Sequence, residues 1–296
     1  MDKVHTSVLL SEAIDALQIE KNKYYVDCTL GDGGYTVEIV RRGGQIFGLD
    51  QDTESIKRAK ERLGALGLSS KVVIKQGNFA ELDNLIDQPV AGFVYDLGVS
   101  SNQLEDGERG FSFSRDAPLD MRMDMNLSVR AADLINGLNK GELEKLFATY
   151  GEFVNKKALK AIIESRKLKA IETTTELAGI VERAVGRGKD KIHPATLIFQ
   201  ALRIAVNDEL NSLRTSLPKA VELLEDGGRI VVVSFHSLED RIAKESFKEF
   251  EKEGKGVVIT EKPITPEVAE IMKNPRSRSA KMRIFEKNEK FKKSDR

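Results

Sequence analysis

The architecture of this chain follows from one stretch of sequence, Val26-Asp27-Cys28-Thr29-Leu30-Gly31-Asp32-Gly33-Gly34-Tyr35-Thr36-Val37-Glu38-Ile39-Val40. Its first residues and the two tyrosines before them are aromatic or β-branched, which is typical of a buried strand. The three glycines then favour a turn in which the backbone adopts unusual dihedral angles or approaches a ligand closely. The apolar residues at the end of the stretch supply the buried side of a helix. Strand, glycine turn and helix, in this order, hold nucleotide-like ligands in α/β folds.

The next acid along the chain indicates which part of such a ligand is bound. Residues 45–50 form a second short apolar run that ends in Asp50, 19 positions after Gly31. At this spacing an acid at the end of the second strand accepts hydrogen bonds from ribose hydroxyls. The alternative is that the glycines and the acid merely form a tight turn.

The charges around the turn favour S-adenosylmethionine as the ligand. Asp27 precedes the glycines, Asp32 lies among them, and the turn contains no lysine or arginine. Pyrophosphate is a poor partner for an acidic loop, and a Walker-type Gly-Lys-Ser/Thr sequence is absent. Acids suit a ligand with an amino group and a cationic centre, and S-adenosylmethionine has both together with a ribose for Asp50.

Further strands extend the predicted sheet. Strands are expected at residues 71–75 and 91–98, so that Asp27, Asp50, Phe79 with its neighbour Asn78, and Asp96 follow the first four strands. Since the carboxyl ends of parallel strands form one rim where ligands bind, these side chains should lie together. Later strands are predicted at 229–235 and 257–259, and an antiparallel edge strand at 281–285.

The strand–helix alternation stops in the middle of the chain, which predicts an inserted domain. Helices are expected at residues 134–150, 154–168 and 175–185, and a long helix at 196–213 leads back to the sheet. We therefore predict three segments: the first part of the sheet domain at 1–104, a helical, substrate-binding insertion at 105–195, and the second part of the sheet domain at 196–296 with a basic C-terminal segment.

Composition narrows the possible partners. The net charge is zero, so a surface for nucleic acid has to be local. Cys28 is the only cysteine, which excludes an internal disulfide, and three histidines without cysteine partners predict no metal site. The N-terminus lacks a signal pattern and no apolar run approaches a membrane span, so we expect no membrane partner and a cytoplasmic location.

Basic residues near the C-terminus are the candidates for RNA contact. Residues 276–296 contain nine basic and three acidic residues, a local charge of +6. Arg276, Arg278, Lys281 and Arg283 are therefore predicted to bind phosphates. The alternative is that they pair with acids such as Asp240 and hold the terminus down.

Three residues are candidates for the chemistry itself. Asp96 follows the fourth strand, where an acceptor can hydrogen-bond the N–H of an exocyclic base amine and orient it toward the transferred methyl group. Asp96 could instead bind the cofactor's own amino group or cap a turn. Ser100 and His236 are further candidates for orienting the amine, although a lone histidine is more often structural. Residues 109–115 combine basic and aromatic side chains that suit base stacking and phosphate contact, or form a loop anchored by two core phenylalanines.

Taken together, the motifs resemble those of one bacterial family, the ribosomal RNA small-subunit methyltransferase H family, also called MraW. The resemblance spans nearly the whole chain and rests on the glycine turn and on residues 5–10, 96–101, 109–113, 118–123, 193–196, 234–241 and 274–279. It implies methyl transfer from S-adenosylmethionine to N4 of a cytidine in small-subunit (16S) ribosomal RNA near the decoding site. The implied fold is α/β, a Rossmann-like class I methyltransferase sheet with an inserted all-helical domain.

The resemblance also implies the residues that hold the cofactor. They are Gly33, Gly34, Tyr35, Asp50, Phe79, Asp96 and Gln103, to which the turn argument above adds Asp27 and Gly31. The family usually has histidine where this chain has Tyr35, a change that a backbone contact would survive and a side-chain contact would not. Ribosomal RNA within an assembled or assembling subunit is the implied substrate, and a homodimer is possible. The rival classes are an NAD-type dinucleotide-dependent oxidoreductase and a non-catalytic RNA-binding protein.

Overall fold

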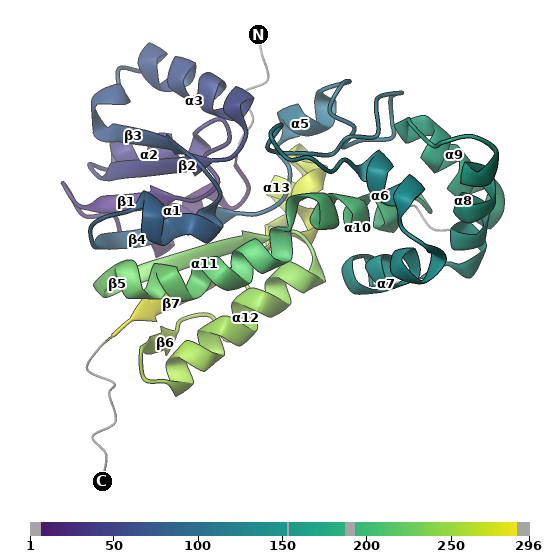
Figure 1. The fold of residues 1–296 in the computed structure, drawn as a ribbon. Coiled ribbons are helices and arrows are strands. Elements are labelled where there is room, and N and C mark those ends of the chain that lie inside the picture. The colour runs from purple at the N-terminus through teal and green to yellow at the C-terminus, as the bar shows by residue number, and fades with distance from the viewer. Residues whose placement is uncertain (1–6, 153, 187–192, 289–296) are drawn as a thin grey trace. The chain divides into compact units, whose positions relative to one another are not determined.

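The computed structural model describes residues 7–152, 154–186 and 193–288, which are drawn in colour in Figure 1. The chain forms two compact units. One unit combines residues up to Gly98 with those from Leu210 onward, and the other is Val99–Glu209. None of the helices in the described part of the chain combines the length and the apolar run that a membrane crossing requires.

The first unit contains a seven-stranded sheet, which confirms the predicted α/β class. The strand order is β3-β2-β1-β4-β5-β7-β6. Strands β3, β2, β1, β4 and β5 are parallel, and β7 pairs antiparallel with both β5 and β6. The strand bounds are β1 (Tyr24–Asp27), β2 (Gln45–Asp50), β3 (Val72–Gln76), β4 (Val90–Asp96), β5 (Leu224–Ser234), β6 (Gly256–Val258) and β7 (Lys281–Lys287).

The last strand was predicted to be antiparallel, which is correct, and to lie at the edge of the sheet, which is wrong. In Figure 1 the yellow strand β7 runs beside β5, and β6 takes the edge. Four of the seven residues of β7 are buried, as suits an inner strand. The alternation of apolar and polar residues in this segment indicates a strand. It does not indicate whether a second strand pairs with its other side.

Helices cover the sheet and supply its core. Their bounds in this unit are α1 (Leu10–Ala16), α2 (Gly34–Arg41), α3 (Thr53–Ala65), α4 (Leu82–Leu85), α11 (Glu209–Leu223), α12 (Ser237–Lys252) and α13 (Val268–Lys273), with short 3-10 turns η1 (Ser69–Lys71), η2 (Phe79–Glu81) and η3 (Pro275–Ser279). Ile14 of α1 and Ile39 of α2 pack in one apolar cluster with Tyr25, Val94 and Val231 of the strands. Burial of such side chains fixes α2 above the glycine turn.

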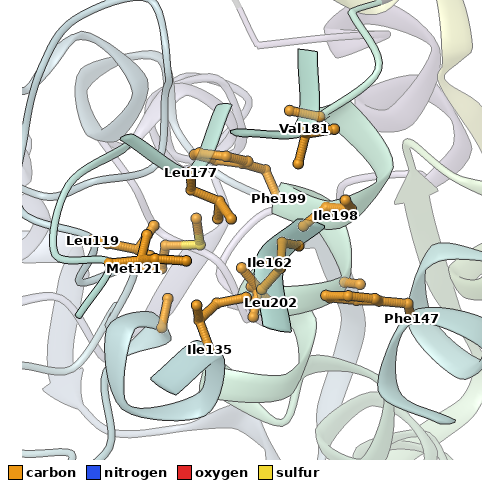
Figure 2. Packing of buried hydrophobic residues seen from close by; sticks show 14 of the residues in the cluster. Leu119, Met121, Ile135, Phe147, Ile162, Leu177, Val181, Ile198, Phe199 and Leu202 are labelled. Carbon is orange, nitrogen blue, oxygen red and sulfur yellow. The ribbon is translucent and has the colours of Figure 1, made fainter. Parts of the chain in front are cut away.

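The second unit is helical. Its helices are α5 (Ser101–Glu105), α6 (Ala131–Gly137), α7 (Lys140–Gly151), α8 (Lys156–Leu168), α9 (Thr174–Val185) and α10 (Thr196–Asn207). Among its described residues the only β pairing is an isolated bridge between Pro118 and Thr173. Figure 2 shows its apolar core, in which Leu119 and Met121 lie near Ile135, Ile162 and Leu202.

Two helices predicted as continuous are each broken in two. The helix expected at 134–150 ends at Gly137, and α7 begins after Asn139, whose side chain accepts from the backbone N–H of Glu142. The helix expected at 196–213 breaks at Asp208, which has a φ of 50°. Because α10 packs with the helical core, the compact unit extends from 99 to 209, beyond the 105–195 predicted for the insertion.

The two motifs at 109–113 and 118–123 form a structural clamp inside the helical unit. The Arg109 guanidinium donates to the backbone carbonyls of Arg122 and Met123 at 2.9 and 3.0 Å. Phe111 is buried, and the ring of Phe113 packs 4.9 Å from that of Phe199, measured between centroids. Of the two interpretations of this loop, the structure shows the anchoring by phenylalanines.

A glycine is required where the two motifs meet. Gly110 has a φ of +73°, and a Cβ added there would lie 2.2 Å from the carbonyl oxygen of Pro118. A left-handed conformation alone costs a residue with a Cβ about 1–2 kcal/mol. A glycine is therefore needed at position 110 for two reasons: the left-handed φ and the close approach of the Pro118 backbone.

Replacing Gly110 by alanine is expected to lower the free energy of unfolding by at least about 1–2 kcal/mol, since the strained φ and the clash add up. Urea denaturation followed by circular dichroism measures the change. Gly107→Ala is the matched control, because a Cβ at Gly107 meets no atom within 4 Å. Equal stability of the two variants would contradict this account of the clamp.

Candidate functional site

Three acids follow three adjacent strands of the sheet. Asp27 ends β1, Asp50 ends β2 and Asp96 ends β4, and β1 lies between the other two strands. The register pairs Asp27 with Gly48 and Val94, so the three strands end close to one another. The sequence therefore placed these carboxylates correctly on one rim, where parallel sheets bind their ligands.

The glycine turn joins β1 to α2 with two left-handed residues. Gly31 has a φ of +49° and Gly33 a φ of +77°. Gly33 is the N-cap of α2, and its own N–H donates to the carbonyl of Leu30 at 2.7 Å. The first turn of α2 contains no acidic residue, and of its backbone N–H groups that of Thr36 is bound by the Asp27 carboxylate, which leaves those of Gly34 and Tyr35 for a ligand. Such a helix start is suited to an anionic group of a ligand.

Asp27 stabilises the glycine turn through hydrogen bonds in the protein interior. Its side chain is fully buried, and its carboxylate accepts from the Thr36 hydroxyl at 2.7 Å and from the Thr29 N–H at 3.3 Å. Burial raises the pKa of Asp27 to about 6, although the bond from Thr36 opposes this shift. The role seen here is to hold the strand end against α2.

Asp50 links the second strand to the glycine turn. Its carboxylate accepts from the Gly31 N–H at 2.8 Å and from the Asp52 N–H at 2.9 Å. Burial raises its pKa to about 6. A carboxylate has about four acceptor positions, so two remain for ribose hydroxyls while the turn stays fixed.

Asp96 differs from the other two acids because part of its carboxylate is unsatisfied. Its backbone N–H donates to the Thr29 hydroxyl at 2.7 Å, which fixes the end of β4. Its Oδ1 atom is buried and has no hydrogen-bond partner in the part of the chain that the structure describes. Burial, and then the charges of Asp27, Glu239 and Glu270, raise the pKa of Asp96. Buried polar atoms are rarely left without partners, so this oxygen points to a ligand.

Phe79 and Tyr35 border the rim in different ways. Phe79 opens η2 directly after β3 and is partly buried, with its ring edge-on to Tyr95 at 5.6 Å between centroids. This is a flat apolar surface of the kind on which a base can lie. The Tyr35 ring is buried and its hydroxyl donates to the carbonyl of Val8. Its side chain is thus used within the protein, and its backbone N–H at the start of α2 is the group suited to a ligand.

Ser100 and Gln103 belong to the helical unit, where they form the capping box of α5. The Gln103 N–H donates to the Ser100 hydroxyl at 3.1 Å, and the Gln103 side chain accepts from the Ser100 N–H at 3.0 Å. Such reciprocal caps satisfy two helix-terminal donors. The structure therefore gives both residues a local role at this helix start.

His236 also caps a helix. It is the N-cap of α12, and its Nδ1 accepts from the Glu239 N–H at 3.4 Å. The Glu239 carboxylate in turn accepts from the N–H of Phe235 at 2.8 Å and of His236 at 3.3 Å. These bonds give the histidine a structural role in the turn after β5, and its buried Nε2 lies 3.1 Å from the Glu239 carboxylate without a hydrogen bond to the described residues.

The four basic residues predicted to bind phosphates fall into two pairs. Arg283 is buried and donates to Asp240 of α12, and Lys281 lies 3.3 Å from the same carboxylate. Burial raises the pKa of Asp240, but the bonds and charges of Arg283 and Lys281 outweigh it and lower the pKa. Arg276 and Arg278 lie in η3 with exposed side chains. Lys281 and Arg283 thus pair with an acid, as the alternative interpretation expects. Arg276 and Arg278 have exposed side chains that RNA could reach.

Comparison with known proteins shows what this chain is similar to. A model of the MraW methylase family matches residues 2–288. A ribosomal RNA small subunit methyltransferase H from Dehalococcoides mccartyi is 45% identical, covering 96% of this chain and 86% of its own length. The enzyme of the same name from Clostridioides difficile is 42% identical, covering 97% of this chain and 100% of its own length. A solved rRNA-methylase structure from Clostridium thermocellum aligns with a TM-score of 0.49 at 15% identity, over 97% of this chain and 98% of its own.

Asp50→Ala is expected to weaken the binding of S-adenosylmethionine about ten- to a hundredfold, because hydrogen bonds to a charged acceptor are worth roughly 1.5–3 kcal/mol. Calorimetric titration measures the affinity, and a melting curve shows whether the glycine turn survives the change. Asp87→Ala, at an exposed acid before β4, serves as the control. Unchanged affinity in Asp50→Ala would remove this residue from the cofactor site.

Proposed function

This chain belongs to the MraW methylase family, and from this premise we infer that it methylates small-subunit ribosomal RNA with S-adenosylmethionine as its cofactor. A dinucleotide-dependent oxidoreductase is excluded by the family. We propose, more specifically, that the methyl group goes to the N4 amine of a cytidine near the decoding site. The observation that carries this proposal is the buried Oδ1 atom of Asp96, which has no hydrogen-bond partner among the residues that the structure describes.

The residues of the rim fit the cofactor. S-adenosylmethionine supplies a methyl group on a sulfonium centre, so that the protein has only to position donor and acceptor. The N–H groups at the start of α2, in Gly34 and Tyr35, suit its carboxylate, and Asp50 suits its ribose. Phe79 offers an apolar surface for its adenine. Asp27 and Gly31 support the turn from behind rather than face the ligand.

Asp96 is the residue that we assign to the target amine. The lone pair of an exocyclic amine is delocalised into the ring, so the amine attacks only when its N–H is bound and its direction is fixed. The free Oδ1 atom can accept that N–H. A cationic sulfonium near the rim favours the ionised carboxylate, which offsets the effect of burial on the pKa of Asp96.

The RNA is proposed to be held by local charge outside the rim. Arg276 and Arg278 are exposed on η3, whereas Arg283 is buried against Asp240 and Lys281 is only partly exposed beside it. We therefore restrict the proposed phosphate contacts to the first two residues. The helical unit is proposed to contribute to substrate binding, with the RNA in an assembled or assembling subunit in the cytoplasm. A homodimer stays a prediction.

Asp96→Asn keeps the size of the side chain and one acceptor oxygen but removes the charge. If Asp96 orients the amine, the single-turnover rate of methyl transfer to ribosomal RNA should fall at least about tenfold more than cofactor affinity does. Rapid-quench transfer assays and calorimetric titration provide the two numbers. An equal loss in both would assign Asp96 to the cofactor, and an unchanged rate would remove it from the site.

Replacing Arg276 and Arg278 together by alanine should weaken RNA binding and leave cofactor affinity unchanged. Each phosphate contact on a single strand contributes about −0.7 to the slope of log affinity against log salt, so the slope should flatten by roughly 1.4. Titrations at several salt concentrations measure it. The control is the double alanine variant of Lys248 and Lys252, which are exposed on α12. A wild-type slope combined with a lower melting temperature would show that the arginines serve only to hold the terminus.

A further inference from the structure

A strained residue lies directly before α1. Leu9 has a φ of 52° and a ψ of 34°, the left-handed conformation, although it is a leucine and fully buried. Such a conformation is unfavourable for a residue with a branched side chain and persists only where the surroundings impose it. Strained backbone of this kind is found preferentially at functional sites, so its surroundings are informative.

Two side chains from distant parts of the sequence hold the segment formed by Ser7, Val8 and Leu9. The Tyr35 hydroxyl, on α2, donates to the carbonyl of Val8. The Glu270 carboxylate, on α13, accepts from the Leu9 N–H at 2.9 Å across 261 residues of sequence. The backbone of the segment is thus tied to the cofactor turn on one side and to α13 on the other.

The segment places Ser7 against the start of α2. A Cβ added to Gly34 would lie 2.0 Å from the Ser7 hydroxyl oxygen and 3.2 Å from its Cβ. Gly34, unlike Gly31 and Gly33, does not have a positive φ. The glycine at position 34 is therefore required by space, and the space is taken by the hydroxyl of Ser7.

This hydroxyl has no visible use inside the protein. Ser7 as a whole residue is only 9% exposed, and its hydroxyl oxygen has no hydrogen-bond partner among residues 7–152, 154–186 and 193–288. Polar groups that are about nine-tenths buried normally have a hydrogen-bond partner, either in the protein or in a ligand. The hydroxyl lies beside Gly34, the first residue of the eight-residue helix α2, and it can donate to a ligand together with the N–H groups of Gly34 and Tyr35.

We propose that Ser7 is a cofactor-binding residue whose hydroxyl donates to the carboxylate of S-adenosylmethionine, and that Glu270 is the positioning residue that holds Ser7 in place. A hydroxyl beside a helix N-terminus is a donor set that suits a carboxylate. The inference rests on the proposed function, because it requires the methionine part of the cofactor to lie over the start of α2. It also gives the strain at Leu9 a purpose, since only the turned segment brings Ser7 to Gly34.

The test compares two ligands that differ at the proposed contact. S-adenosylhomocysteine has the amino-acid carboxylate, and 5′-methylthioadenosine lacks it while keeping the adenosine and the sulfur. Ser7→Ala should weaken S-adenosylhomocysteine about tenfold, as expected for a lost hydrogen bond to a charged group, and leave 5′-methylthioadenosine unchanged. Calorimetric titration of the purified full-length chain gives both affinities.

The results separate this inference from the proposed function. An unchanged affinity of Ser7→Ala for S-adenosylhomocysteine, or an equal loss for both ligands, overturns the inference alone, because the serine would then only pack. A wild-type chain that binds neither ligand overturns the proposed function together with the inference.

The positioning role of Glu270 is tested with the same two ligands. Glu270→Ala should show the same selective loss as Ser7→Ala, and Glu270→Gln should recover most of it because its amide oxygen still accepts the Leu9 N–H. Glu267→Ala is the matched control, since Glu267 lies exposed on the preceding turn and makes no side-chain cap bond. A loss of equal size for both ligands in Glu270→Ala, or the same selective loss in Glu267→Ala, would contradict the assignment.

Discussion

The structure depends on an electrostatic constraint: three carboxylates end three adjacent strands, where Asp27 is fully removed from water and Asp50 and Asp96 are partly removed from it. Burial is the first cause of the raised pKa of Asp27, Asp50 and Asp96. A raised pKa means that the folded protein disfavours the charged form, so at neutral pH the rim reduces stability. A ligand that brings a cationic centre and hydrogen-bond donors offsets this cost. Burial of the three acids therefore explains both why their pKa values are raised and why a cationic ligand suits the rim.

The same acids also build the turn that receives the ligand. Asp27 ties α2 to β1 through Thr36, and Asp50 ties the left-handed Gly31 to the end of β2. Each of these carboxylates is satisfied by two donors, whereas Asp96 retains one oxygen without a partner. In the proposed site, the first two acids hold the scaffold and Asp96 is the one assigned to the reacting amine. The turn is therefore formed before the ligand arrives, which lowers the cost of binding.

The sequence was sufficient for features set by local pattern and was not sufficient for those set by distant partners. The strands, the glycine turn and the spacing to Asp50 follow from periodicity and turn chemistry, and the strand bounds lie within two residues of those predicted, except that β5 begins at Leu224 and not at 229. The breaks at Asn139 and Asp208 depend on one cap and one left-handed residue, which apolar periodicity does not reveal. The partner of Arg283 lies 43 residues away, so its sequence neighbourhood showed only a basic run.

The central claim is that this chain methylates N4 of one cytidine in small-subunit ribosomal RNA. The most direct test is nucleoside mass spectrometry of that RNA, mapped by fragment, from cells with and without the gene for this chain. The account predicts that N4-methylation of one cytidine near the decoding site disappears without the chain and returns when the wild-type chain is supplied. An unchanged set of methylated cytidines in cells that lack the chain would contradict it.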